Sequence, residues 1–104
     1  MTHPVLRVPR DEVLSGTAVR LTDGAVTVCL VRVGDDFYAI GDSCSHGAVS
    51  LSEGEVDAEG LVVECWMHGS SFSLLDGRPQ SLPAIKPVPV YEVTVEGDEV
   101  VVRS

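Results

Sequence analysis

Residues 25–40 read Ala-Val-Thr-Val-Cys-Leu-Val-Arg-Val-Gly-Asp-Asp-Phe-Tyr-Ala-Ile, and this stretch decides the fold class. Residues 25–33 are β-branched and apolar on both faces, which is the pattern of a strand that is covered on both sides. Gly34-Asp35-Asp36 is typical of a tight hairpin turn and leads into a second strand over 37–40. The core therefore contains an antiparallel hairpin.

Short strands continue on both sides of this hairpin. Further strands are predicted over 17–22, 61–64, 91–96 and 100–102, with a turn at Gly97-Asp98. No window of eleven or more residues has a helical period, and residues 10–14 form at most one helical turn. The spacing of the strands predicts an all-β fold, an antiparallel sandwich or barrel.

Length and charge restrict the class of protein. The chain has 104 residues, so we expect a single domain over 1–104. A net charge of −9 argues against nucleic acid and anionic membranes as partners. We find no apolar run long enough to span a membrane and no secretory signal, and three cysteines do not suggest a disulfide framework. We therefore expect a cytoplasmic protein.

Two segments depart from the strand pattern and carry the chemistry. Residues 41–54 and 65–71 are rich in Gly, Ser, Cys and His and are predicted to be loops. The first contains Cys44-Ser45-His46-Gly47 and the second Cys65-Trp66-Met67-His68-Gly69. Three of the 104 residues are histidines, so one Cys meets a His at a fixed offset by chance only about 3% of the time. Two such pairs indicate a metal site.

The residue types restrict the metal. Thiolate and imidazole suit iron–sulfur clusters, zinc and copper, whereas calcium and magnesium prefer oxygen. A glycine directly after each histidine permits a positive φ and a close approach of the backbone to the metal. Two candidates follow from the residues alone: a structural zinc site of the Cys₂His₂ type, or a Rieske 2Fe–2S cluster.

The chain resembles Rieske-type ferredoxins, including the small electron-transfer components of bacterial aromatic-ring dioxygenase systems. The family pattern is C-x-H, a spacer, and then C-x₂-H, which this chain matches at Cys44, His46, Cys65 and His68. Leu51-Ser52-Glu53-Gly54, Gly69-Ser70-Ser71-Phe72-Ser73, Asp76-Gly77 and Leu82-Pro83-Ala84 extend the resemblance over nearly the whole chain. It implies a Rieske fold, with a small cluster-binding subdomain at about 41–75 formed by the two loops.

The resemblance also implies the role of each site residue. Cys44 and Cys65 would hold one iron, and His46 and His68 would hold the outer iron near solvent. Around these ligands we expect supporting residues at Gly47, Trp66, Met67, Gly69, Ser70 and Phe72. Ser70 would donate a hydrogen bond to a sulfide. Trp66 would pack over the loop, which we favour, or anchor a partner.

Departures from the high-potential members of the family predict a low reduction potential. Those members carry one extra cysteine in each loop, and the two cysteines form a disulfide. In this chain the corresponding positions are Ala48 (or Val49) and Met67, so the disulfide is absent. They also have a tyrosine where this chain has Phe72, and its hydroxyl bonds to a cysteine sulfur. Hydrogen bonds to sulfur stabilise the reduced cluster, and this cluster would accept fewer of them. We therefore expect a reduction potential toward the low end of the Rieske range of roughly −150 to +300 mV.

The resemblance implies a one-electron carrier rather than an enzyme. Electrons would arrive from a flavin-containing, NAD(P)H-dependent reductase and leave to a terminal oxygenase. The alternatives are a structural zinc module, a Rieske-like small subunit of a reductase such as nitrite reductase, and a redox sensor or iron–sulfur-assembly accessory. Residues 33–77 contain nine acidic and no basic residues, so this cluster-bearing stretch carries the whole net charge. Such a stretch favours partners with basic patches.

Overall fold

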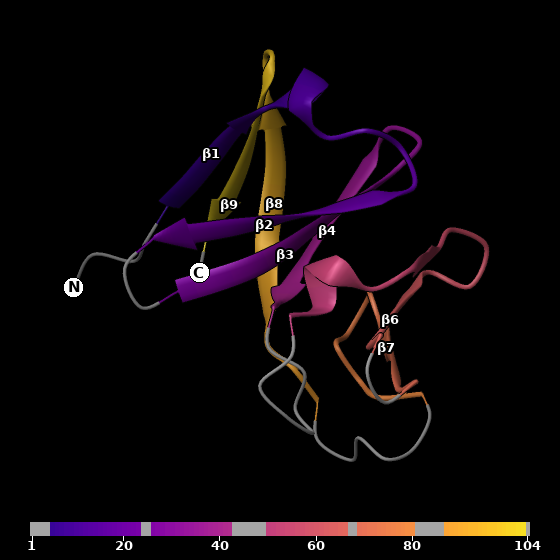
Figure 1. Cartoon of the computed structure of the whole chain (residues 1–104). Coiled ribbons are helices and arrows are strands. Elements are labelled where there is room, and N and C mark those ends of the chain that lie inside the picture. The colour runs from indigo at the N-terminus through magenta and orange to yellow at the C-terminus, as the bar shows by residue number, and fades with distance from the viewer. Residues whose placement is uncertain (1–4, 24–25, 43–49, 67–68, 81–86, 104) are drawn as a thin grey trace.

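The computed structural model describes residues 5–23, 26–42, 50–66, 69–80 and 87–103. Within these ranges the chain forms strands and two single-turn 3₁₀ helices (Figure 1). The strands are β1 (Val5–Pro9), β2 (Thr17–Asp23), β3 (Val26–Val33), β4 (Asp36–Gly41), β5 (Val56–Asp57), β6 (Val62–Glu64), β7 (Ser71–Ser73), β8 (Val90–Glu96) and β9 (Glu99–Arg103); the helices are η1 (Arg10–Glu12) and η2 (Leu51–Glu53). In this described part, no helix is long and apolar enough to cross a membrane.

Six strands form the main sheet in the order β1-β9-β8-β4-β3-β2, and every pairing in it is antiparallel. The β3–β4 and β8–β9 hairpins each turn over a Gly-Asp pair. Gly34 has φ +62° and Gly97 has φ +65°, a region that glycine enters without the steric cost of a Cβ. Both turns were predicted from the sequence and are confirmed.

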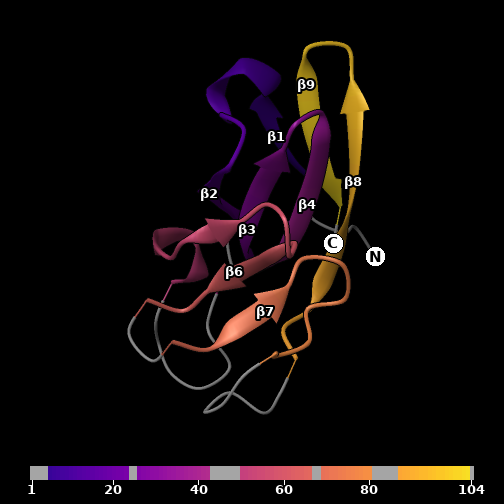
Figure 2. The same ribbon diagram turned by 90° about the vertical axis from the view of Figure 1, so that its right-hand side faces the viewer.

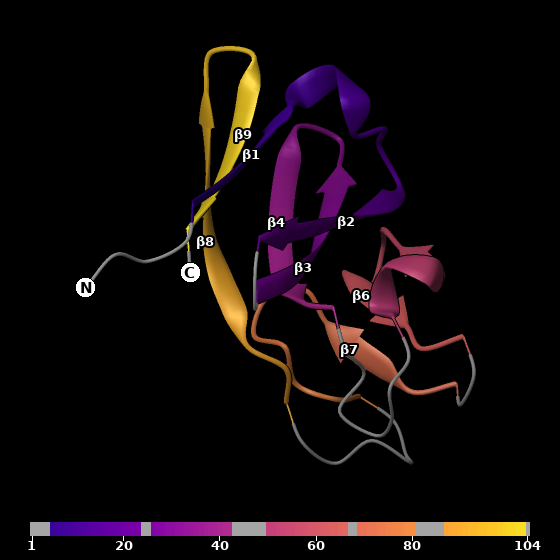
Figure 3. The same cartoon turned by 60° about the vertical axis from the view of Figure 1, so that its left-hand side comes forward.

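The main sheet curls, so that the strands of its two ends face each other (Figure 3). Apolar residues fill the space between β1 and β9 on one side and β3 and β4 on the other. This first core contains Leu6, Val8, Val13, Val28, Leu30, Ala39, Val100 and Val102. The predicted all-β, antiparallel architecture is confirmed.

A smaller sheet, in the order β5-β6-β7, lies against the other face of β3 and β4 (Figure 2). The second core between the two sheets contains Cys29, Val31, Ile40, Leu51, Val63, Cys65, Phe72, Leu74 and Val88. β3 therefore contributes Val28 and Leu30 to the first core and Cys29 and Val31 to the second. This two-sided burial confirms the prediction from the apolar pattern of residues 25–33, of which residue 25 lies outside the described ranges.

The small sheet is the part that the sequence predicted least well. The strand predicted over 61–64 contains β6 (Val62–Glu64), but β5, β7 and η2 were not predicted. These elements are two or three residues long, too short for a periodic pattern to show them. The predicted loop over 41–54 therefore also contains η2, and the predicted loop over 65–71 ends at the first residue of β7. In the main sheet, β1 was not predicted either.

Cys29 behaves as a buried apolar residue. Its side chain has no exposed surface, and burial, with a smaller contribution from the charge of Asp42, raises the pKa of the thiol to about 12. The thiol is thus neutral at physiological pH. This agrees with its sequence-based assignment as a core residue without a ligand role.

Gly54 marks the closest approach between η2 and the small sheet. A Cβ on this residue would overlap the backbone carbonyl oxygen of Glu64 and lie 3.3 Å from the carbonyl oxygen of Leu51. The φ of Gly54 is −86°, which any residue can adopt, so the constraint is steric rather than conformational. The Glu64 N–H donates to the Glu55 carbonyl oxygen at 2.8 Å, which fixes β6 against this segment.

We predict that Gly54→Ala lowers the free energy of unfolding by about 3 kcal/mol, because a backbone carbonyl cannot move aside without breaking the small sheet. Glu55→Ala is the control, since its side chain is exposed and should cost less than about 0.5 kcal/mol. Urea unfolding followed by circular dichroism measures both. Equal stabilities for the two variants would contradict the steric account.

Candidate metal centre

The second predicted loop connects β6 to β7 and is closed at its base by backbone hydrogen bonds. The Cys65 N–H donates to the Ser70 carbonyl oxygen at 2.6 Å, and the Gly69 N–H donates to the Cys65 carbonyl oxygen at 2.8 Å. The register of the two strands ends one residue earlier, at the Glu64–Ser71 pair. The backbone of Cys65 is thus held at the end of a short hairpin.

Cys65 itself is fully buried and belongs to the second core, together with Leu51 and Phe72. Ser70, its partner across the turn, is fully buried as well. A sulfur atom in apolar surroundings, with little solvent, is the environment of a structural cysteine or of a thiolate that holds a soft metal. Cys65 is the one residue of the four predicted ligands that the structure describes, and its surroundings fit an iron–sulfur or zinc centre.

Gly69 has φ +75°, and a Cβ on it would meet no atom within 4 Å. The glycine is thus required for the conformation of the turn rather than for space. The positive φ that the sequence predicted for a glycine directly after His68 is confirmed, and the close approach of this backbone to the metal stays a prediction.

The first predicted loop is closed by Asp42, which directly follows β4. Its carbonyl oxygen accepts the Leu51 N–H at 2.6 Å, and its carboxylate accepts the Ser52 N–H at 2.9 Å and the Ser50 hydroxyl. The described residues on either side of segment 43–49 are thereby joined. Sequence reasoning missed this residue, although an acidic residue at the end of an apolar strand, two positions before Cys44, was the available signal.

The described residues bring part of the predicted site together. Cys65, Gly69 and Ser70 share one turn, and Phe72 follows on β7 with its side chain buried in the second core. Trp66 is 53% exposed, which does not support the favoured expectation that it packs over the loop. The remaining predicted site residues, Cys44, His46, Gly47, Met67 and His68, lie outside the described residues.

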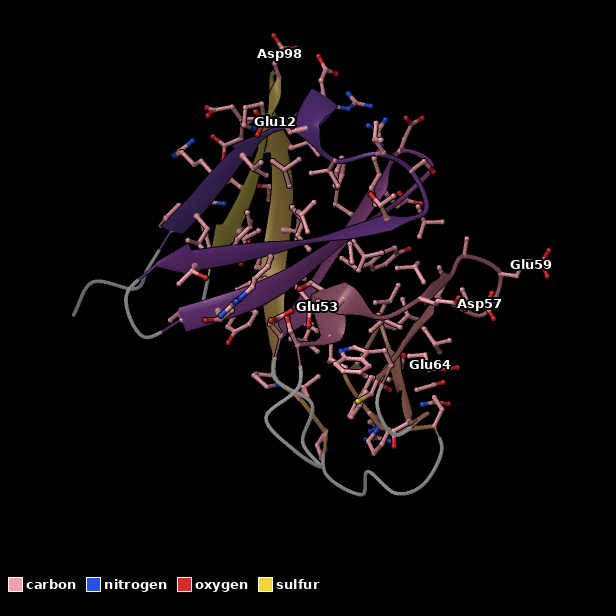
Figure 4. All side chains as sticks on the ribbon, viewed as in Figure 1. Glu12, Glu53, Asp57, Glu59, Glu64 and Asp98 are labelled. Carbon is pink, nitrogen blue, oxygen red and sulfur yellow. The ribbon has the colours of Figure 1, made fainter. Side chains whose placement is uncertain are left out.

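The side of the molecule that carries the small sheet bears five exposed acidic side chains. Figure 4 shows Glu53, Asp57, Glu59 and Glu64 there, whereas Glu12 and Asp98 lie toward the opposite end. We call Glu53, Glu55, Asp57, Glu59 and Glu64 the acidic surface; all five are exposed. Within the described residues, none of the five forms an ion pair.

Comparison with protein-family models matches residues 3–92 to the Rieske [2Fe-2S] domain, a range that contains both Cys–His motifs. Among curated proteins, ferredoxin CarAc of Metapseudomonas resinovorans is 47% identical over 81 residues, which cover 78% of this chain and 74% of the relative.

Solved structures give the same result. The ferredoxin of carbazole 1,9a-dioxygenase from Nocardioides aromaticivorans IC177 superimposes with a TM-score of 0.90 at 34% identity, covering 98% of this chain and 97% of the other. A ferredoxin–oxygenase complex of carbazole 1,9a-dioxygenase contains a chain with a TM-score of 0.88 and 42% identity, covering 95% and 92%. A nitrite reductase small subunit from Mycobacterium tuberculosis has a TM-score of 0.85 but only 24% identity, with coverage of 100% and 97%, and shows the fold alone.

The positive φ of Gly69 predicts a local effect of substitution. Gly69→Ala should lower the free energy of unfolding by about 1 kcal/mol and speed the loss of bound metal to a chelator, because an alanine at this positive φ would strain the turn that begins at Cys65. Gly97→Ala is the matched control, with φ +65° and equally open surroundings but at the distant β8–β9 hairpin.

The control should lose a similar amount of stability but keep the wild-type rate of metal loss. Metal content against time in a chelator, measured beside denaturant unfolding, tests this. Identical rates of metal loss in the two glycine variants would show that the Gly69 turn does not position a ligand.

Proposed function

Because the chain belongs to the Rieske [2Fe-2S] domain family, whose cofactor is a 2Fe–2S cluster, we propose that it is the ferredoxin of a bacterial dioxygenase system. It carries one electron at a time and does not itself transform a substrate. The observation that carries this proposal is the family match over residues 3–92, together with 47% identity to a curated ferredoxin.

The proposal assigns the cluster to the four residues of the two motifs. Cys44 and Cys65 hold the inner iron, and His46 and His68 hold the outer one. The full burial of Cys65 supports an inner position for the cysteine ligands. The whole chain, 1–104, is a single Rieske domain whose cluster-binding subdomain spans about 41–75, and the small sheet and η2 within that range support this division.

Ser70 and Phe72 adjust how readily the cluster accepts an electron. In the proposal the buried Ser70 hydroxyl donates a hydrogen bond to a cluster sulfur, which favours the reduced and more negative form. Phe72 is buried in the second core and has no hydroxyl to add a second bond. A potential toward the low end of the Rieske range remains our prediction.

A flavin-containing, NAD(P)H-dependent reductase supplies the electron, and a terminal oxygenase receives it. The structural relative that was solved as a complex of reduced oxygenase and oxidised ferredoxin supports the oxygenase as acceptor. The reductase is what the resemblance to dioxygenase ferredoxins implies, and a flavin would let a two-electron donor such as NAD(P)H deliver single electrons. We place the carrier in the cytoplasm, where NAD(P)H is available.

The docking surface combines exposed Trp66 with the acidic surface. Trp66 follows the β6 residue Glu64 by two positions, and both side chains are exposed. A large aromatic side chain among carboxylates suits a partner surface with an apolar pocket and a basic rim. Negative charge on this side steers the partner toward the two cluster loops, through which the electron leaves.

Transfer to an oxygenase tests the proposal. The dithionite-reduced protein is mixed rapidly with an oxidised carbazole 1,9a-dioxygenase oxygenase, and the rate of oxidation is followed by absorbance at low and high salt. We expect one electron per chain to be transferred, with a second-order rate constant that falls severalfold as salt rises. Transfer that is absent, or that is insensitive to salt, would count against this function.

Two double variants with the same change in net charge locate the docking side. Glu59→Gln with Glu64→Gln removes two charges from the acidic surface, and Glu12→Gln with Asp98→Asn removes two from the opposite end (Figure 4). We expect the first pair to slow transfer severalfold and the second to leave the rate nearly unchanged. Equal effects of the two pairs would refute steering by the acidic surface.

A further inference from the structure

Asp42 is the one charged side chain that is buried within the described ranges, at 3% exposure. It directly follows β4, and its N–H donates to the Thr27 carbonyl oxygen of β3 at 3.2 Å. Removing a carboxylate from water is costly unless hydrogen bonds or an opposite charge compensate. An uncharged asparagine could close the loop equally well. Loop geometry alone therefore does not explain why a carboxylate is buried at this position.

The carboxylate is stabilised by neighbours on both sides of the loop. One oxygen accepts the Ser52 N–H at 2.9 Å, and the other accepts the Ser50 hydroxyl and lies 3.6 Å from Nε of Arg20 on β2. Arg20 is 61% exposed, so solvent screens its charge more than that of Asp42. The neutralisation is thus partial, and a net negative charge remains in the interior.

The field of this charge extends into the protein. The charge of Asp42 contributes to the raised pKa of Cys29, which lies on the neighbouring strand β3 in the second core. Cys65, a proposed ligand, belongs to the same core. Along the chain Asp42 precedes Cys44 by only two residues, a backbone distance of at most about 7 Å.

We propose that Asp42 is a positioning and tuning residue of the centre: it closes the loop that bears Cys44 and His46, and its buried charge lowers the reduction potential. Adding an electron makes the cluster more negative, so a fixed negative charge nearby opposes reduction. Arg20 acts in the opposite direction by offsetting part of that charge. This inference rests on the proposed site at Cys44, His46, Cys65 and His68.

Potentials of three loaded variants test the proposal by spectroelectrochemistry, with no partner protein present. Asp42→Asn keeps the shape of the side chain and its acceptor for Ser52 but loses the charge. We expect the equilibrium constant for one-electron reduction to rise about tenfold, which is about 59 mV. Arg20→Gln should shift the potential in the opposite direction and by less, because Arg20 is exposed.

Glu53→Gln is the matched control. It removes the same charge from an exposed position on η2, next to Ser52, and should shift the potential much less than Asp42→Asn. The electron paramagnetic resonance spectrum of each reduced variant should match the wild type, because the ligands are unchanged. Opposite shifts with an unchanged spectrum support tuning by charge.

Shifts of the same sign for Asp42→Asn and Arg20→Gln, or shifts no larger than that of Glu53→Gln, would overturn the proposal. If Asp42→Asn does not retain the cluster, Arg20→Gln decides alone: a lower potential supports the tuning role, and an unchanged or higher one refutes it. Failure of electron transfer to an oxygenase would affect the proposed function but not these potentials, so the two claims fail separately.

Discussion

Two backbone hydrogen bonds close the two segments that carry the Cys–His motifs, and the proposed metal site depends on both. The bond from the Cys65 N–H to the Ser70 carbonyl oxygen closes one loop, and the bond from the Leu51 N–H to the Asp42 carbonyl oxygen closes the other. Ligands on closed turns have little conformational entropy left to lose when they bind a metal. In the proposed site each loop supplies one cysteine and one histidine, so the site would depend on both closures.

β3 connects these closures to the body of the protein. It is buried on both faces, packing against residues of β1 and β9 through one set of side chains and against the small sheet through the alternate set. Cys65 and Phe72 lie in the second of these cores together with Cys29 of β3, so the main sheet supports the turn that begins at Cys65. The acidic surface and Trp66 remain exposed on the same half of the molecule, available to a partner.

The sequence predicted most of the long strands and the type of metal cofactor. It predicted less well the short elements and the residues that surround the proposed site. Alternation and glycine turns were sufficient for β2, β3, β4, β8 and β9, whereas β1 (Val5–Pro9), which is also five residues long, was not predicted. β5 and β7 are too short for such a pattern. Asp42 acts through its contact with Ser50 and Gly54 through its contact with Glu64, eight and ten positions away, and only the fold brings these residues near. Trp66 was expected to pack, but its exposure depends on the turn at 65–70.

The central claim is that the two Cys–His motifs hold one 2Fe–2S cluster. A visible absorption spectrum before and after dithionite, with iron and zinc measured on the same sample, tests it most directly. We expect a brown protein with about two irons per chain, whose broad visible bands bleach on reduction. A colourless protein with about one zinc per chain would contradict the claim and indicate a structural zinc module instead.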